Sequence, residues 1–280
     1  MRMEENAYGK INLALDVLFK RDDGYHEINS IMQKISLHDT VVIEEGGKGV
    51  DIECDNKLVP LDHTNLAHKA WEEISKLTGT KAGIRVRIHK RIPVAAGLAG
   101  GSSNGAAVLK GLNEMWNLGL SQRDLMDIGG RMGADIPFCI LGGTALAEGI
   151  GERLTSLKPF RDKHILLANP GIGISSAYAY SRLAIPNDHK DMEPMLQCIE
   201  KDDLKCLAQE MFNVFEAAII PENPIIGDIK KTMEDNGALG ALMSGSGASV
   251  FGLYDDLDKL EFTKRKLKEN IPYVFHVTSI

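Results

Sequence analysis

The sequence predicts an α+β protein of two domains, and three observations carry this prediction. The length of 280 residues corresponds to roughly two domains at about 150 residues each. The first half alternates strand-like and helix-like patterns. After about residue 158 the order becomes strand, helices, two strands, helix and strand, which is typical of a split βαβ, ferredoxin-like domain. We therefore expect an N-terminal domain over residues 1–157 and a C-terminal domain over residues 158–280.

The N-terminal half opens with a predicted β-hairpin. Residues 10–18 alternate apolar and polar side chains, as in a strand with one buried face, so Lys10 and Asn12 share the polar face. A turn at Asp22-Asp23-Gly24 precedes a second extended run from Tyr25 onward. The other elements expected in this half are strands over 40–44 and 84–89 and helices over 65–78, 102–116 and 121–133.

The C-terminal half begins with a predicted strand over residues 164–168, which ends at the turn signal Asn169-Pro170-Gly171. Its remaining elements follow in the ferredoxin-like order. They are helical segments within 176–234, strands over 238–243 and 248–254, a charged helix over 256–269 and a last strand over 273–278.

The composition excludes several classes of partner. The chain has 32 Lys and Arg against 39 Asp and Glu, a formal net charge of −7. This acidic balance argues against a protein that binds nucleic acid or a membrane surface. No apolar stretch approaches the roughly 20 residues of a membrane span, and the first residues lack the apolar core of a signal peptide. We expect a cytoplasmic protein with no nucleic-acid or membrane partner.

The four cysteines are expected to be reduced. They form no C-x-x-C pair and no zinc spacing; they are Cys54, Cys139, Cys198 and Cys206. If Cys198 and Cys206 share one helix, their eight-residue separation places them about 12 Å apart along its axis, too far for a disulfide.

A glycine-rich loop before the helix at 102–116 is the most informative stretch. Four glycines occupy the nine positions 97–105, and Ser102, Ser103 and Asn104 begin the helix. Glycine allows backbone amides to approach a ligand closely, and a helix N-terminus is a natural phosphate site. We expect residues 97–104 to hold the phosphates of a nucleotide.

The loop matches neither the Walker pattern nor the G-x-G-x-x-G dinucleotide pattern. It does contain G-x-S-x-G at Gly101–Gly105, the nucleophile elbow of α/β hydrolases. That motif requires a buried strand directly before the serine, and the residues before Ser103 have a loop composition. A serine hydrolase with Ser103 as nucleophile is therefore a minor alternative.

Taken together, the motifs resemble those of the GHMP small-molecule kinases. The loop Pro93–Ser103 is similar to the family's phosphate loop, although Val94-Ala95-Ala96 stands where other members often have more glycine. The turn Ser244-Gly245-Ser246-Gly247-Ala248 is similar to the family's third motif. A more specific set, Lys10–Leu13, Asp23–His26, Asn65–Leu66, Gly133–Phe138 and Gly142–Ala145, resembles one branch of the family over almost the whole chain.

The resemblance implies a fold and an activity. The fold would combine an N-terminal nucleotide-binding domain, like domain 2 of ribosomal protein S5, with a C-terminal ferredoxin-like domain. The activity would be transfer of the γ-phosphoryl group of ATP to the 2-hydroxyl of a cytidine diphosphate-linked methylerythritol, in the non-mevalonate route to isoprenoids. Mg²⁺ would accompany ATP, with no ligands assigned in this chain, and the protein would be a monomer or weak homodimer.

The resemblance also implies roles for individual residues. Asp135 would accept the proton of the substrate hydroxyl or orient its oxygen, and Lys10 would hold Asp135 ionised and place a cation beside the transferred phosphate. Ser103 and the loop amides would bind the β- and γ-phosphates. The residues expected to bind ATP are Asn65, Pro93, Val94, Ala95, Ala96, Gly97, Leu98, Ala99, Gly100, Gly101, Ser102, Ser103 and Asn104.

The cytidine substrate would be bound by residues from both halves of the chain. Tyr25 and Tyr180 are expected to stack on the cytosine ring while His26 reads its edge; Asn12 and Ser176 would contact the substrate. Two further alternatives remain open: a GHMP kinase for another alcohol, such as homoserine or mevalonate, and a binding module without catalytic activity.

Overall fold

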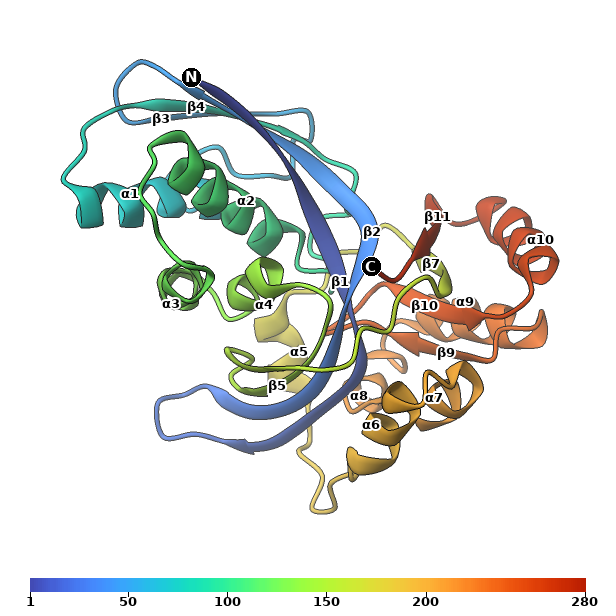
Figure 1. The fold of residues 1–280 in the computed structure, drawn as a ribbon. Helices are drawn as coiled ribbons and strands as arrows, with labels where there is room; N and C mark the ends of the chain where they lie inside the picture. Colours follow the sequence, from blue (N-terminus) through green and yellow to red (C-terminus); the bar gives the residue numbers. More distant parts are fainter. The chain divides into compact units, whose positions relative to one another are not determined.

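The computed structural model describes residues 1–280 (Figure 1). The chain forms two compact units. Unit 1 consists of Met1–Gly9, Leu37–Val94 and Ala99–Gly142, and unit 2 of Lys10–Ser36, Ala95–Leu98 and Gly143–Ile280. The units interleave in the sequence, since two N-terminal segments group with the C-terminal half. The predicted domain boundary after residue 157 stays a prediction.

Unit 1 contains part of a seven-stranded sheet, together with four helices. The end of β2 (His26–Glu45) pairs antiparallel with β4 (Ile84–His89), and β3 (Val50–Cys54) pairs parallel with β4. The start of β1 (Arg2–Lys20) also belongs to this unit. The helices are α1 (Leu66–Thr78), α2 (Gly100–Met115), α3 (Gln122–Met132) and α4 (Ile136–Leu141).

Local sequence signals set these helix boundaries. The N-cap residue of α1 is Asn65, whose side chain accepts from the amide of Ala67, and the helix ends at Gly79 in the left-handed region (φ 70°). Ser121 and Asp124 form a capping box at the start of α3. Helices α1 and α2 pack against each other and bury an apolar core that includes Ile74.

Unit 2 contains the N-terminal hairpin. The rest of β1 and the start of β2 are joined at a turn closed by the Arg21 amide, which donates to the carbonyl of Tyr25 at 2.8 Å. This confirms the predicted hairpin. Strand β2 pairs antiparallel with β5 (Thr144–Gly149), β5 with β6 (Arg153–Ser156), and β1 pairs parallel with the short β8 (Phe212–Asn213).

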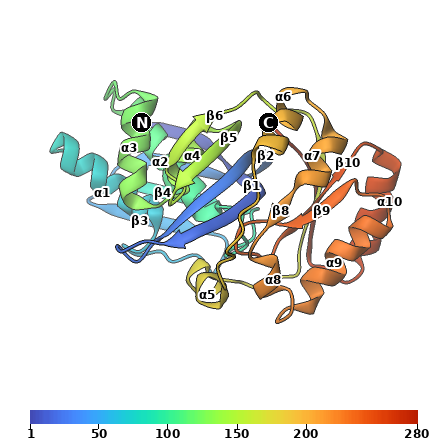
Figure 2. The same cartoon turned by 90° about the horizontal axis from the view of Figure 1, so that it is seen from below.

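A second sheet of unit 2 has the strand order β11-β7-β10-β9, and all neighbouring strands are antiparallel. Its strands are β7 (His164–Asn169), β9 (Gly240–Met243), β10 (Val250–Tyr254) and β11 (Tyr273–Thr278). Helices α9 (Pro224–Asp235) and α10 (Leu257–Lys268) pack on it (Figure 2). This arrangement confirms the predicted ferredoxin-like order.

The sequence pattern missed several short elements. They are β3, β5, β6, β8 and α4, together with α8 (Glu216–Ile219) as a separate helix. The strands predicted at 10–18 and 40–44 are parts of the much longer β1 and β2. In β1 every residue from Gly9 to Val17 is buried, so both faces of the strand are covered there. No helix is long and apolar enough to span a membrane.

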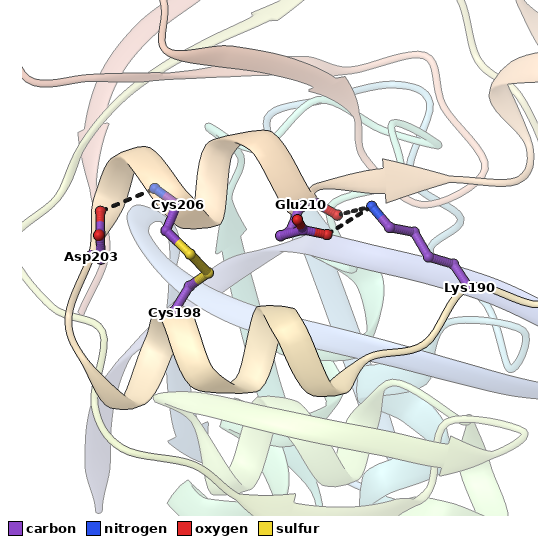
Figure 3. The surroundings of a disulfide bond; sticks show 5 residues. All are labelled: Lys190, Cys198, Asp203, Cys206 and Glu210. Carbon is purple, nitrogen blue, oxygen red and sulfur yellow. Dashed lines mark hydrogen bonds and ion pairs between the residues drawn. A yellow bond between two sulfur atoms is a disulfide. The ribbon is translucent and has the colours of Figure 1, made fainter.

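The expectation of four reduced cysteines is wrong for one pair, because Cys198 and Cys206 form a disulfide with a Cα–Cα distance of 5.6 Å (Figure 3). They do not share a helix. Cys198 lies on α6 (Glu193–Glu200) and Cys206 on α7 (Leu204–Glu210), and a tight turn reverses the chain between the two helices. The side chain of Asp203 caps α7 by accepting from the Cys206 amide at 3.0 Å.

Candidate active site

The first strand places Lys10 and Asn12 in a buried chain of hydrogen bonds. The two residues are 5% and 1% exposed, so their shared face is buried rather than solvated. Lys10 Nζ donates to Asn12 Oδ1 at 2.7 Å, Asn12 Nδ2 donates to Ser30 Oγ at 2.8 Å, and Ser30 Oγ donates to the carbonyl of Ala14 at 2.6 Å. This chain fixes the direction in which the ammonium group points. Ser30 was not expected from the sequence.

Asp135 directly precedes the short helix α4. Its carbonyl accepts from the amide of Cys139 at 3.1 Å, but its carboxylate does not cap the helix. Pro137 lies in the first turn of α4, where a missing N–H costs no hydrogen bond. Asp135 belongs to unit 1 and Lys10 to unit 2, and their pairing stays a prediction.

The glycine-rich loop before α2 contains three residues in the left-handed region: Ala95 (φ 52°), Gly97 (φ 73°) and Ala99 (φ 56°). Alanine adopts this conformation only at a cost of about 1–2 kcal/mol, so the surrounding contacts hold the loop in shape. Ala99 is the N-cap residue of α2 and makes no side-chain cap, so no side chain satisfies the first amides of the helix. Such a helix start attracts phosphate groups.

The second glycine-rich turn, Ser244–Ala248, holds the middle of this loop. Ser244 Oγ donates to the carbonyl of Gly97 at 3.0 Å. A Cβ atom on Gly97 would lie only 2.1 Å from the carbonyl oxygen of Ser244, so no other residue fits at this position. The part Ala95–Leu98 of the first motif therefore packs against the second motif within unit 2.

Asn213, on β8, holds the second turn in place, although nothing in the sequence indicated it. Its Nδ2 atom donates to the carbonyls of Met243 and Gly245 at 2.7 and 2.8 Å, and its Oδ1 atom accepts from the amide of Phe215 at 3.0 Å. The residue is 7% exposed. All the polar groups of its side chain are thus used to shape the backbone of this turn.

The side chains at the start of α2 differ in their surroundings. A Cβ atom on Gly101 would have only Leu66 nearby, at 3.9 Å, so this exposed position has room for a side chain. Ser103 is 2% exposed, and its hydroxyl donates to the carbonyls of Gly100 and Ala7 at 2.9 and 3.3 Å. The hydrolase alternative is wrong, because Ser103 lies buried inside a helix and not on an exposed strand-to-helix turn.

The two asparagines expected at the nucleotide site make structural contacts. Asn65 caps α1, and its Nδ2 atom also donates to the carbonyl of Pro60 at 2.6 Å. Asn104 is 3% exposed and donates from Nδ2 to the carboxylate of Asp39 at 2.9 Å. The nucleotide contacts of both residues stay predictions.

Residues predicted to bind the cytidine group come together in unit 2. The rings of His26 and Tyr180 are stacked, with centroids 4.4 Å apart and planes 16° apart, and Phe215 packs edge-on against Tyr180. Burial, and then the nearby charge of Lys20, lower the pKa of His26. Its imidazole is therefore neutral at pH 7 and offers one donor and one acceptor. His26 lies flat on Tyr180, and Tyr25, 59% exposed, follows the turn beside it.

The two tyrosines of helix α5 (Ser176–Arg182) have different surroundings. Tyr178 points outward, and its hydroxyl donates to Glu222 Oε2 at 2.5 Å. It lines an open pocket of about 440 Å³ together with Gly173, Ile174, Ser175, Glu222 and Asn223. Tyr180 points to His26 instead. Ser176 is exposed at the first turn of α5.

The structure contains no group of three or more His, Cys, Asp or Glu side chains that could hold a metal ion. The Mg²⁺ expected with ATP therefore has no assigned protein ligands.

Comparisons with known proteins agree with these motifs. Residues 65–143 match the family model of the GHMP kinases N terminal domain, and residues 195–272 match that of the GHMP kinases C terminal domain. The chain is 48% identical over 252 residues to a 4-diphosphocytidyl-2-C-methyl-D-erythritol kinase from Acetivibrio thermocellus, covering 89% of each chain. It is 43% identical over 280 residues to an enzyme of the same name from Clostridium botulinum, covering 99% of this chain and 100% of the relative.

Solved structures show the same likeness. The crystal structure of a 4-(cytidine 5'-diphospho)-2C-methyl-D-erythritol kinase matches with a TM-score of 0.84 and 29% identity, over 99% of this chain and 100% of the other. A homoserine kinase from Cytophaga hutchinsonii matches with a TM-score of 0.80 at 19% identity, over 100% of this chain and 94% of the other. The second likeness shows a shared fold.

Proposed function

The chain belongs to the GHMP kinases, in the branch of the 4-diphosphocytidyl-2-C-methyl-D-erythritol kinases, and on that premise we propose how its residues carry out the reaction. The reaction is ATP-dependent phosphorylation of the 2-hydroxyl of 4-diphosphocytidyl-2-C-methyl-D-erythritol, in the non-mevalonate route to isoprenoid precursors. What we propose is which residues bind the phosphates and transfer the phosphoryl group. The observation that carries it is the uncapped start of α2 within the glycine-rich loop.

The phosphates of ATP lie over residues 97–104 in this proposal. The first amides of α2 donate to phosphate oxygens, and the positive end of the helix dipole adds to the attraction. The open space at Gly101 and the shape of the loop support this placement. The hydroxyl of Ser103 already donates within the protein, so backbone amides provide most of the contacts. Mg²⁺ accompanying ATP would neutralise part of the charge on the phosphates, and no ligands for it are assigned in this chain.

Asp135 and Lys10 act on the acceptor hydroxyl. The 2-oxygen of the substrate forms a bond to the γ-phosphorus while the bond from that phosphorus to the β-phosphate oxygen breaks, and ADP leaves. The hydroxyl proton passes to Asp135, which aligns the oxygen at the same time. Lys10 stabilises negative charge on the transferred group. Support comes from the bond of its ammonium to Asn12, which fixes its direction.

The cytidine group binds near the His26–Tyr180 pair. A flat aromatic surface is formed by these stacked rings, and the exposed ring of Tyr25 stands at the adjacent turn. The neutral imidazole of His26 matches the donor and acceptor groups on the edge of cytosine. Asn12 and Ser176 contact the rest of the substrate. The base lies between the rings of Tyr25 and Tyr180, which requires His26 to leave its stacked position and meet the edge of the base.

We also propose that residues 1–157 and 158–280 correspond to the two GHMP kinase domains, because the two family-model matches fall on either side of this boundary. The enzyme is proposed to work in the cytoplasm, where its donor ATP is available, as a monomer or weak homodimer.

A coupled ADP-release assay across a panel of alcohols tests the function. We expect turnover with 4-diphosphocytidyl-2-C-methyl-D-erythritol and little with homoserine or mevalonate, and phosphorus NMR of the product should place the new phosphate on the 2-oxygen. Faster ADP release with homoserine or mevalonate than with the cytidine substrate would overturn the assignment.

A further inference from the structure

A buried carboxylate outside the predicted site makes four hydrogen bonds around the glycine-rich loop. Asp39 lies on β2 in unit 1 and is 0% exposed. Its Oδ1 atom accepts from the amides of Arg91 and Ile92 at 2.8 and 2.9 Å. Its Oδ2 atom accepts from Lys90 Nζ at 2.5 Å and from Asn104 Nδ2 at 2.9 Å. Every acceptor position of the carboxylate is therefore used.

These partners come from the two ends of the loop. Arg91 and Ile92 are the last residues before Pro93, and Asn104, in the first turns of α2, is the last residue of the segment predicted to hold phosphate. One carboxylate thus joins the entrance and the exit of the loop. Fixing both ends of a loop removes much of the conformational freedom that its amides would otherwise lose when a ligand binds.

Lys90 supplies the positive charge for this carboxylate, and its side chain is 4% exposed. A Cβ atom on Gly100 would lie 3.0 Å from Lys90 Nζ, so the ammonium group is packed directly under the first residue of α2. Asp39 holds the ammonium in this position. Without the carboxylate, a buried ammonium would have lost its counter-charge, which is strongly unfavourable.

We propose that Asp39 is a positioning residue for nucleotide binding: it holds the two ends of the phosphate-binding loop and the ammonium of Lys90 in the arrangement that ATP requires. The proposal rests on the proposed function in one respect, the placement of ATP phosphates over residues 97–104. Asp39 is fully buried and acts through Arg91, Ile92, Lys90 and Asn104, not by contact with the substrate.

The test uses Asp39→Asn and the double variant Asp39→Asn with Lys90→Met. The single variant keeps the shape of the side chain but turns an acceptor into a donor that faces other donors. The double variant also removes the buried ammonium, so that it folds without an unpaired charge. Asp16→Asn is the matched control, because Asp16 is also a buried carboxylate, 1% exposed, but it bonds to the amide of Val17 and to His189 instead.

Three measurements are made on the whole protein. The first is ATP affinity by calorimetry with Mg²⁺ present, and the second is the separate KM values for ATP and for the cytidine substrate. The third is amide hydrogen exchange of residues 93–104, with strand β10 as the reference segment. Both Asp39 variants should bind ATP at least tenfold more weakly and exchange the loop amides faster. The KM for the cytidine substrate and the exchange of β10 should stay within about twofold of wild type, as should every value for Asp16→Asn.

Unchanged ATP affinity in the folded double variant would overturn the proposal, as would equal losses for ATP and the cytidine substrate. Calorimetry and exchange need no turnover. If the wild-type protein binds ATP but does not phosphorylate the cytidine substrate, the proposed function fails while the role of Asp39 is still decided by these two measurements.

Discussion

Two single residues, Asp135 and Lys10, are proposed to act on the reacting atoms. Asp135→Asn keeps the shape of the side chain and removes its ability to accept a proton, and Lys10→Ala removes a cation. We expect each to lower kcat by about 10²–10⁴-fold, the usual contribution of a positioned proton acceptor or charge. Steady-state ADP release measures this, with circular dichroism to show that each variant is folded.

The exposed Asp127 on α3 provides the control, since Asp127→Asn makes the same chemical change away from the site and should keep wild-type turnover. Turnover close to wild type in Asp135→Asn or Lys10→Ala would remove that residue from the mechanism.

Two glycines of the same loop should respond differently to substitution. Gly101→Val adds a side chain where the nearest atom to a Cβ is 3.9 Å away, so the protein should fold while ATP affinity falls at least tenfold. Gly97→Ala places a methyl group against the carbonyl of Ser244 at a position with φ 73°, so it should destabilise the fold itself. Thermal unfolding and calorimetry separate the two effects. Wild-type ATP affinity in folded Gly101→Val would contradict the proposed phosphate site.

The two tyrosines of α5 provide a matched pair. Tyr180→Ala removes a ring that stacks on His26, whereas Tyr178→Ala removes a ring that points to Glu222. Base stacking on an aromatic ring contributes roughly 1–3 kcal/mol, so Tyr180→Ala should raise the KM for the cytidine substrate about fivefold or more and leave the KM for ATP nearly unchanged. A larger rise in the KM for the cytidine substrate in Tyr178→Ala than in Tyr180→Ala would assign the stacking role to Tyr178.

At the level of elements, the disulfide between α6 and α7 should stabilise the helix pair in unit 2. It closes a loop between residues eight apart in sequence. A loop of this length corresponds to about 2–3 kcal/mol in the chain-entropy model. Mass spectrometry of the non-reduced protein should find Cys198 linked to Cys206, and a reducing agent should lower the unfolding temperature. The double variant Cys198→Ala/Cys206→Ala should lose this sensitivity; equal sensitivity in that variant would assign the effect to other thiols.

Strands β7 and β11 carry a pair of histidines that should make stability depend on pH. His164 Nδ1 and His276 Nε2 are 3.1 Å apart, and Glu261 of α10 lies 3.3 Å from His276 Nδ1. Burial, and then the charge of His164, lower the pKa of His276 from its usual 6.5, although Glu261 opposes the shift. Between the lowered and the usual pKa, the unfolded chain binds more protons than the folded chain, so acid favours unfolding.

The free energy of unfolding should therefore decrease as the pH falls below about 6.5, with the loss complete below the pKa of folded His276. Urea titrations from pH 5 to 8 measure this. His276→Gln should flatten the dependence, and His63→Gln, at an exposed histidine, should not. An identical pH profile in His276→Gln would show that other groups cause the loss.

At the level of the whole molecule, the two compact units interleave along the chain. A linear reading of the sequence divides it once, near residue 157, because composition and element order change there. The structure groups Lys10–Ser36 and Ala95–Leu98 with the C-terminal half because these segments pair with β5 and β8 and bond to Ile174 and Ser244. Such pairings between distant segments leave no local pattern.

The sequence alone determined the family, the ferredoxin-like order, the hairpin, the longer helices of the N-terminal half and the glycine-rich loop. Each of these depends on residues that are neighbours in the chain or that recur as short motifs. The tertiary structure decided what depends on residues distant in sequence. Asp39 accepts a hydrogen bond from Asn104, and Asn213 shapes the turn after Met243. A reversal of the chain brings Cys198 close to Cys206. In the sequence, a buried aspartate or asparagine cannot be distinguished from one in a surface turn, because the difference lies in how the side chain packs.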